Sequence, residues 1–150
     1  PAFMRGFVQN IILRRAVPFT GTAGVQFVSL TPERVEVRLA NEHRVRNHIG
    51  SVHASAMNLL AETATGMAVG MNVRDDCLPL AKELSMAFKK RATGALKAVA
   101  TLTAEQRAAM QASDKGEVQV KVTVTDETGV EPVECAFTWA WVPSSRPAKN

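Results

Sequence analysis

The sequence predicts an α+β domain in which one antiparallel sheet of about six strands wraps around a single long central helix. One observation is a helical stretch in the middle of the chain, from about Val52 to Met71, that is apolar on most sides. Another is that segments before and after it alternate apolar and polar residues, as strands with one buried face do. The chain of 150 residues is long enough for one domain, residues 1–150, and too short for two.

The central helix carries an apolar stripe and a polar stripe. Its apolar residues recur at three- and four-residue steps, which predicts burial; they are Met57, Leu60, Ala61, Ala64, Met67, Ala68 and Met71. Ser55, Asn58, Glu62 and Thr65 follow the same spacing, so they share a second face. Because a buried carboxylate is costly unless it is paired, hydrogen-bonded or used, Glu62 is the first candidate functional residue. A structural hydrogen bond or an ion pair is the alternative for Glu62.

Before the central helix, the pattern predicts one helix and two strands. An amphipathic helix is expected from Ala2 to Arg15, with Pro18 ending it and Gly21 and Gly24 marking a loop. Two strands are then expected at residues 25–30 and 34–39. In the second of them Val35, Val37 and Leu39 alternate with charged residues, which predicts one buried and one exposed face.

After the central helix, the pattern predicts four strands and a short helix. The expected strands cover residues 80–88, 96–102, 118–124 and 133–141. The short helix is expected at residues 103–112, capped by Thr103 with Gln106 at the third position. A hairpin turn is expected at residues 126–129, and a loose tail from Pro143.

Composition weighs against several classes of function. The net charge of +4 comes from scattered basic residues with few aromatic residues beside them, so no nucleic-acid partner is expected. No apolar run is long enough to span a membrane and the N-terminal residues lack a signal-peptide layout, so no membrane partner is expected. Cys77 and Cys135 lie far apart, which favours reduced thiols in a cytoplasmic protein. The spacing of His43, His48 and His53 does not favour a metal site.

Lys89, Lys90 and Arg91 form the one basic cluster in the sequence. They lie at the end of a predicted strand, where a solvated strand end is one interpretation and a phosphate-binding edge beside a ligand is the other. Arg44 and Arg46 precede the central helix and are candidates to contribute to the same edge.

The turn before the central helix carries a motif. Asn47, Gly50, His53 and Glu62 fall at the spacing of a pattern in the phenylacetyl-CoA thioesterase-like branch of the hotdog superfamily, in which a sheet wraps around a helix. The later segment TDETGVEPVECAFTWAWV resembles an uncharacterised thioesterase-like branch of that superfamily. The sequence departs from the first pattern in two places, because Ala54 and Ser55 replace a Gly-Gly pair and the acid is Glu rather than Asp.

The resemblance implies an acyl-CoA thioesterase without a cofactor. Glu62 would act as general base on a water or as nucleophile, and the N–H of Ala54 at the helix start would bind the oxyanion. Asn47 would orient the water or the thioester, while His53 would serve in catalysis or as a structural cap. Substrate contacts would come from Ser55, Asn58 and Thr65, and from Lys89, Lys90 and Arg91 at the phosphates.

Two other functions remain open at this point. A non-catalytic protein that binds acyl-CoA or an acyl lipid is the main alternative, because the Cβ atoms of Ala54 and Ser55 would crowd a thioester that passes close to a Gly-Gly backbone. An acyl dehydratase-type hotdog protein is another, although the sequence lacks an evident hydratase motif.

Helix geometry adds an expectation about assembly. Ala54 and Glu62 are eight residues apart, and eight residues of helix advance roughly 12 Å, so Glu62 and the Ala54 amide of one chain cannot both contact one carbonyl group. If both act, they come from two subunits with antiparallel central helices. The sequence therefore predicts a homodimer or a dimer of dimers, as the resemblance also implies. It leaves the acyl group undetermined.

Overall fold

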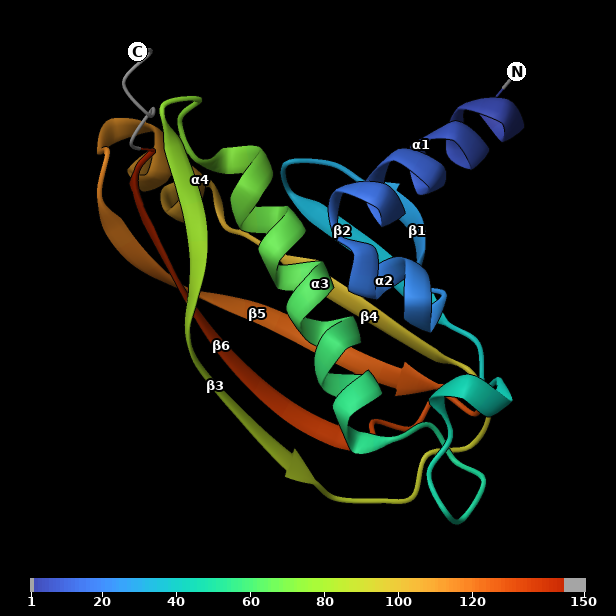
Figure 1. The fold of residues 1–150 in the computed structure, drawn as a ribbon. Coiled ribbons are helices and arrows are strands. Elements are labelled where there is room, and N and C mark those ends of the chain that lie inside the picture. The colour runs from blue at the N-terminus through green and yellow to red at the C-terminus, as the bar shows by residue number, and fades with distance from the viewer. Residues whose placement is uncertain (1, 145–150) are drawn as a thin grey trace, which may run out of the picture.

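The computed structural model describes residues 2–144, with side chains from Met4 onward. Within these residues, four α-helices, one short 3₁₀ turn and six strands follow one another (Figure 1). In chain order they are α1 (Ala2–Ala16), α2 (Pro18–Ala23), β1 (Gln26–Leu30), β2 (Arg34–Leu39), η1 (His43–Val45), α3 (Ala54–Asn72), β3 (Cys77–Phe88), β4 (Leu96–Thr101), α4 (Ala104–Ala112), β5 (Gly116–Asp126) and β6 (Val133–Pro143).

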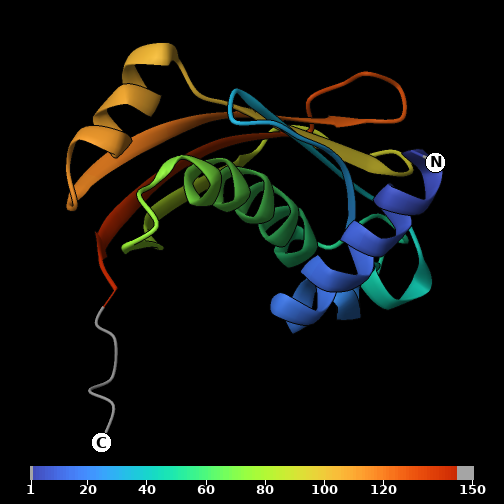
Figure 2. The same cartoon turned by 90° about the horizontal axis from the view of Figure 1, so that it is seen from above.

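The six strands form one antiparallel sheet in the order β1-β2-β4-β5-β6-β3. The sheet curls, and α3 lies along its concave face (Figures 1 and 2). The predicted α+β architecture is therefore confirmed.

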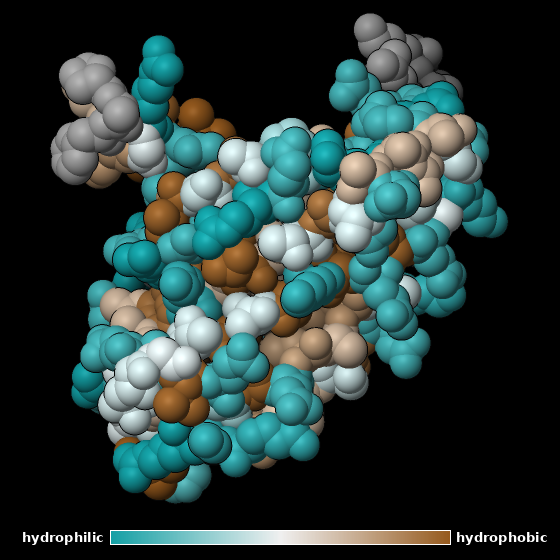
Figure 3. Space-filling model, turned by 180° about the vertical axis from the view of Figure 1, so that it is seen from behind, coloured by the Kyte–Doolittle hydropathy of each residue, from teal (hydrophilic) through white to brown (hydrophobic). Residues whose placement is uncertain are grey.

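Seen from behind, the molecule presents a mixture of hydrophilic and hydrophobic residues (Figure 3). Such a mixed surface is normal for the exposed side of a sheet that buries only one face.

The core lies between α3 and the sheet. Leu60, Ala61 and Ala64 of α3 are fully buried, as the apolar stripe predicts. Val37 of β2 and Ala98 of β4 are also fully buried. The small side chains on α3 allow the helix axis to approach the strands closely, while the larger residues fill the space that remains.

The N-terminal segment differs from its prediction beyond residue 16. Pro18 does not lead into a loop but begins a second helix, α2, in which Gly21 lies. A proline is tolerated at the first position of a helix because its missing N–H would have no acceptor within the helix. Gly24 ends α2 with a φ of 80°, a left-handed conformation that suits glycine.

Strand β3 also differs from its prediction, in length and in burial. It begins at Cys77, three residues before the expected start, and pairs along its length with β6. The expected strand has Leu80, Leu84, Met86 and Phe88 on its apolar face. In the structure Leu80, Leu84 and Phe88 are exposed, whereas Met86 is half-buried against the core. β3 has a neighbouring strand on one side only because it is an edge of the sheet, and strand order depends on contacts between distant segments.

Several local predictions are confirmed. Thr103 and Gln106 form both hydrogen bonds of a capping box at the start of α4. The predicted turn at residues 126–129 lies at the start of the loop between β5 and β6, where the Gly129 N–H donates to the Asp126 carbonyl. The Asp126 carboxylate accepts hydrogen bonds from the N–H and hydroxyl of Thr128. Hydrogen bonds from Thr128 outweigh the effect of burial and lower the pKa of Asp126. Of the predicted loose tail, Pro143 ends β6, and residues 145–150 lie outside the described residues.

One buried hydrogen bond connects α3 to the C-terminal strand. The indole N–H of Trp139 donates to the hydroxyl of Thr65 at 2.9 Å, and both side chains are buried. Thr65→Val keeps the shape of the side chain but leaves this N–H without an acceptor, so it should lower the free energy of unfolding by about 1–3 kcal/mol. Urea unfolding followed by tryptophan fluorescence measures the effect.

The matched control is Thr63→Val on the same helix. The Thr63 hydroxyl donates only to the Leu59 carbonyl of its own helix, so this change should stay within about 0.5 kcal/mol of wild type. Equal unfolding free energies for the two variants would show that the Trp139 bond does not stabilise the fold.

Candidate functional site

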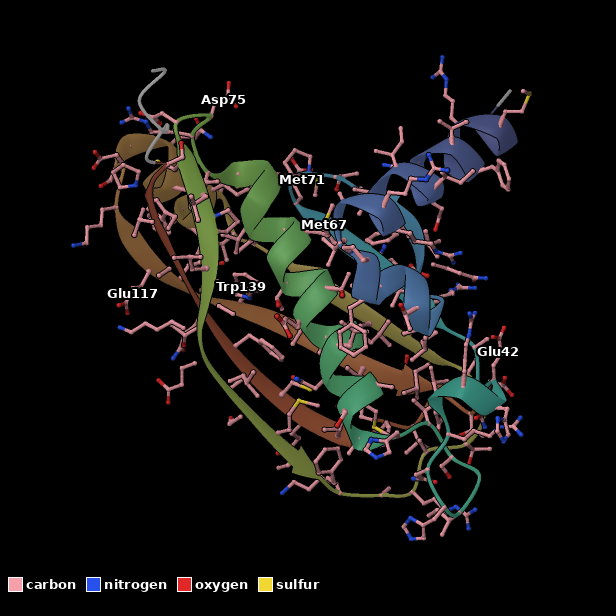
Figure 4. All side chains as sticks on the ribbon, in the orientation of Figure 1. Glu42, Met67, Met71, Asp75, Glu117 and Trp139 are labelled. Atoms are coloured by element: carbon pink, nitrogen blue, oxygen red, sulfur yellow. The ribbon has the colours of Figure 1, made fainter. Side chains whose placement is uncertain are left out.

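A cavity of about 310 Å³ lies between α3 and the N-terminal helices. Its walls are mostly apolar and come from six elements and a linker: Leu59, Glu62, Thr63, Gly66, Met67 and Gly70 of α3, Leu13 of α1, Val17 in the linker, Thr20 of α2, Phe27 of β1, Pro79 of β3 and Trp139 of β6. Figure 4 shows Met67 on the side of α3 that faces α1, and Trp139 reaching α3 from β6. The cavity is thus on the side of α3 that the sheet leaves open.

Glu62 is the one charged residue among the described residues that line this cavity. Its side chain is half-buried, and its carboxylate forms no hydrogen bond or ion pair with any residue from 4 to 144. Within the described residues, Glu62 therefore lacks the ion pair or hydrogen bond that a purely structural role would use. A partnerless carboxylate in apolar surroundings is free to accept a proton or to attack an electrophile.

Gly66 allows the Trp139 ring to pack against α3 at the cavity wall. A Cβ atom at this position would lie 2.7 Å from the Trp139 ring, closer than real Cβ contacts allow. The absence of a side chain therefore lets the indole pack directly on α3, where its N–H reaches Thr65.

His53 caps the start of α3. Its Nδ1 accepts a hydrogen bond from the Ser55 N–H at 3.0 Å, while its carbonyl accepts from the N–H groups of Ala56 and Met57. The Ala54 N–H alone among the first four amides of α3 has no acceptor among the described residues. Because it lies at the positive end of the helix dipole, this N–H can bind an anionic oxygen.

Asn47 organises the turn that precedes α3. Its Oδ1 accepts hydrogen bonds from the N–H groups of Ile49 and Ser51, at 3.0 and 3.1 Å. A side chain used in this way forms an Asx turn and orders the loop. The Nδ2 group of Asn47 forms no hydrogen bond with a described residue, so it stays available to donate to a ligand.

Arg91 brings the basic cluster to this same turn. Its guanidinium donates to the Ser51 hydroxyl at 3.1 Å and to the Ile49 carbonyl at 2.6 Å. Lys89 lies 3.8 Å from Glu134 in an exposed ion pair, and the exposed Lys90 side chain forms no ion pair or hydrogen bond with a described residue. The structure therefore joins two regions that are about forty residues apart in the sequence.

The other members of the polar stripe lie in different surroundings. Ser55 is exposed at the helix start, and Thr65 is fully buried beneath Trp139. The Oδ1 atom of Asn58 is buried without a hydrogen-bond donor among the described residues. An unsatisfied buried acceptor one helical turn before Glu62 is costly, and a ligand, a water or a second chain would satisfy it.

A second cavity of about 240 Å³ adjoins the start of α3. Arg44, Arg46, His53 and Ser55 line it together with Leu59, which also lines the Glu62 cavity.

Periodicity in the sequence did not identify the cavity walls that α1, α2 and their linker supply. These are Leu13 and Val17 in the Glu62 cavity and Phe19 in the second cavity. Nothing in their local pattern distinguishes a cavity wall from a core residue.

Comparison with solved structures supports the same architecture. One similar structure is a Pseudomonas aeruginosa protein of unknown function that is described as a probable thioesterase. It is 25% identical with a TM-score of 0.82, over 91% of this chain and 95% of that chain. A thioesterase from Haemophilus influenzae is 14% identical with a TM-score of 0.68, over 87% of this chain and 86% of that chain. A Staphylococcus aureus thioesterase carrying a Gln-to-Ala change is 16% identical with a TM-score of 0.69, over 83% of this chain and 98% of that chain. No curated protein matches the sequence significantly.

A family model described as a domain of unknown function, DUF4442, matches residues 7–142. This match covers the helix α3, the whole sheet apart from Pro143 and all the candidate site residues named above. The chain therefore belongs to the DUF4442 family, and it has the hotdog fold that these thioesterase structures share.

Proposed function

We propose that this protein is an acyl-CoA thioesterase that uses Glu62 as its catalytic carboxylate. The observation that carries the proposal is the position of Glu62, half-buried and without a partner among the described residues, on the wall of an apolar cavity of about 310 Å³. Such a cavity suits an acyl chain. The fold, shared with structures described as thioesterases, supports the same reaction class.

A pair of altered Staphylococcus aureus structures supports the choice of residues. In that protein a glutamine and a glutamate were each replaced by alanine. The two positions are separated by the same number of residues as Asn47 and Glu62 are here. This spacing agrees with roles for both Asn47 and Glu62, with Asn47 donating through its free Nδ2.

The chemistry would proceed as follows. Glu62 removes a proton from a water, and the resulting hydroxide attacks the thioester carbonyl carbon. The carbonyl oxygen becomes an oxyanion, which the Ala54 N–H stabilises. Collapse of this intermediate breaks the C–S bond, and the thiolate takes up the proton, leaving a free thiol and a carboxylic acid. Direct attack by Glu62 would instead form an anhydride, which water then hydrolyses.

The site requires two subunits. Ala54 and Glu62 are eight residues apart on one helix, about 12 Å along its axis, so they cannot meet at one carbonyl carbon within a chain. The edge strand β3 offers an interface, because it exposes Leu80, Leu84 and Phe88 beside unpaired backbone groups. A long apolar edge of this kind either pairs with another chain or promotes aggregation. We therefore propose a dimer in which Glu62 acts with the partner's Ala54.

The first prediction from this mechanism concerns Glu62→Gln. The change keeps the size of the side chain and removes the base or nucleophile, so kcat on the best acyl-CoA should fall on the order of 10²–10⁴-fold. Thiol release followed with a chromogenic disulfide, over a panel of acyl-CoA chain lengths, measures it. Glu131→Gln, at an exposed position, is the control and should keep wild-type turnover.

Wild-type turnover by Glu62→Gln would contradict the assignment. If the wild type hydrolyses no acyl-CoA in the panel, the alternative function is favoured, a non-catalytic protein that binds acyl-CoA or an acyl lipid. Ala54 and Ser55 in place of Gly-Gly would then explain the loss of hydrolysis, through their Cβ atoms.

The second prediction tests the composite site by complementation. Ala54→Pro removes the free N–H, and a proline is well tolerated at the first helical position. His53 already has φ −63° and ψ 145°, as a residue before proline requires. Each single variant should be nearly inactive. Co-expressed Ala54→Pro and Glu62→Gln chains should recover about a quarter of wild-type activity, because half of the dimers would carry one intact site.

Sedimentation equilibrium at micromolar concentration verifies that both variants form dimers. Activity in the mixture no higher than in either variant alone would contradict a site shared between subunits, and a monomeric wild type would remove it altogether.

The third prediction concerns the phosphates of coenzyme A. Lys90 is exposed and unpaired with any described residue, whereas Arg91 holds the turn. Lys90→Ala should raise KM for acyl-CoA by up to about fivefold and leave KM for the matching acyl-pantetheine thioester unchanged. Lys121→Ala, another exposed lysine, is the control. An equal effect on both substrates would show that Lys90 is only a solvated strand end.

A further inference from the structure

Helix α1 is held to the protein by two polar side chains, Asn10 and Arg14, beside the apolar Leu13. The Asn10 amide donates to the Phe27 carbonyl at 3.0 Å and accepts from the Phe27 N–H at 2.8 Å, as a neighbouring strand would. The Arg14 guanidinium donates to the carbonyls of Val25 and Gly24. These bonds fix α1 to β1 and its preceding residues, so the orientation of the helix is well defined by polar contacts.

The apolar side of α1 faces outward as a result. Met4, Phe7, Val8 and Ile12 are 60%, 63%, 50% and 59% exposed, and Ile11 is exposed beside them. Residues at these spacings form one broad stripe on a helix. Taken over its whole length, however, α1 is only weakly amphipathic, so that prediction is not confirmed. The apolar Leu13 lies on the inner side, where it lines the Glu62 cavity, and Arg15 lies among the outward apolar residues. The N-terminal part of α1 also extends past the sheet (Figure 1).

The charges on this surface are all positive. Residues 1–32 contain Arg5, Arg14 and Arg15 and neither Asp nor Glu. Arg5 and Arg15 are exposed and form no ion pair or hydrogen bond with a described residue, whereas the exposed Arg34 and Arg38 both pair with Glu36. An exposed helix face that combines large apolar side chains with unpaired arginines matches the chemistry of an anionic lipid surface.

A second copy of the chain fits this face less well. A symmetric contact through α1 would place Arg5 and Arg15 of one protomer against the same arginines of its partner, which is unfavourable. A helix crossing the bilayer is not the occupant either, because no helix among the described residues is long and apolar enough to span a membrane. A helix that lies in the plane of the lipid headgroups needs no such length.

We propose that α1 is an interfacial helix that binds an anionic lipid surface. Met4, Val8 and Ile12 enter the boundary between headgroups and acyl chains, and Arg5 and Arg15 extend to the lipid phosphates. This reverses the expectation of no membrane partner, which rested on the absence of a spanning segment. The proposal is independent of the thioesterase reaction, since none of these residues touches Glu62 or the start of α3.

The experiment is flotation of the full chain with vesicles. Wild type should float with vesicles of phosphatidylcholine and phosphatidylglycerol in equal parts, and much less with phosphatidylcholine alone. Each arginine near an anionic surface contributes about fivefold to the binding constant, so Arg5→Gln with Arg15→Gln should weaken binding on the order of 20-fold. Added salt should weaken wild-type binding in the same way.

The apolar contribution is tested by Val8→Asp with Ile12→Asp. Each buried methylene contributes about fourfold, so this variant should lose binding on the order of 100-fold or more. Ile49→Asp, an apolar residue of similar exposure on the turn before α3, is the matched control and should bind as wild type does. A fluorescence measurement locates the helix on the vesicle. Brominated lipids should quench the fluorescence of a tryptophan introduced by Phe7→Trp only when the vesicles are anionic.

Three outcomes would overturn the proposal: no flotation of wild type with anionic vesicles, wild-type binding by the Val8→Asp, Ile12→Asp variant, or no quenching of the introduced tryptophan. Sedimentation equilibrium distinguishes the competing occupant. If the Val8→Asp, Ile12→Asp variant forms a smaller assembly than wild type while vesicle binding is absent from both, the face is an interface between copies.

Discussion

The packing of α3 against the concave face of the sheet is the constraint on which the rest of the structure depends. A sheet can cover only one side of a helix, so the buried side of α3 uses small and aliphatic residues such as Ala61 and Ala64. The opposite side is left for other elements to cover. The buried hydrogen bond between Trp139 and Thr65 fixes how far the indole reaches around the helix. The same indole lines the Glu62 cavity.

The candidate site results from this incomplete coverage. α1, α2 and their linker close over α3 but leave a cavity of about 310 Å³, in which Glu62 is the charged residue. The same helix presents the unbonded N–H of Ala54 at its start, because the His53 side chain accepts the next amide instead. The Glu62 carboxylate and the Ala54 N–H lie on one rigid helix and cannot approach each other. The proposed mechanism therefore needs antiparallel copies of α3 that supply one group each.

Two exposed apolar surfaces lie at opposite edges of the sheet, and their chemistry differs. At the β3 edge, apolar side chains accompany backbone groups that a second strand can satisfy, which suits another copy of the chain. On α1 the backbone bonds lie within the helix, and the exposed side chains are apolar or cationic, apart from the neutral Gln9. A surface without backbone donors and without acidic residues suits a fluid anionic layer better than a paired strand. These two surfaces would leave the protein able to dimerise and to dock on lipid at the same time.

The sequence by itself determined most of the elements and their chemistry, although it did not predict the helix α2. Period and capping residues were enough to place α3, α4 with its capping box, the six strands and Glu62 on a polar stripe, because these signals act within one or two turns of chain. Only the tertiary structure decided that β3 is an edge, that Arg91 meets the turn at Ser51, and that the apolar side of α1 faces outward. Periodicity shows which residues share a face, but what covers that face depends on contacts between segments far apart in the chain.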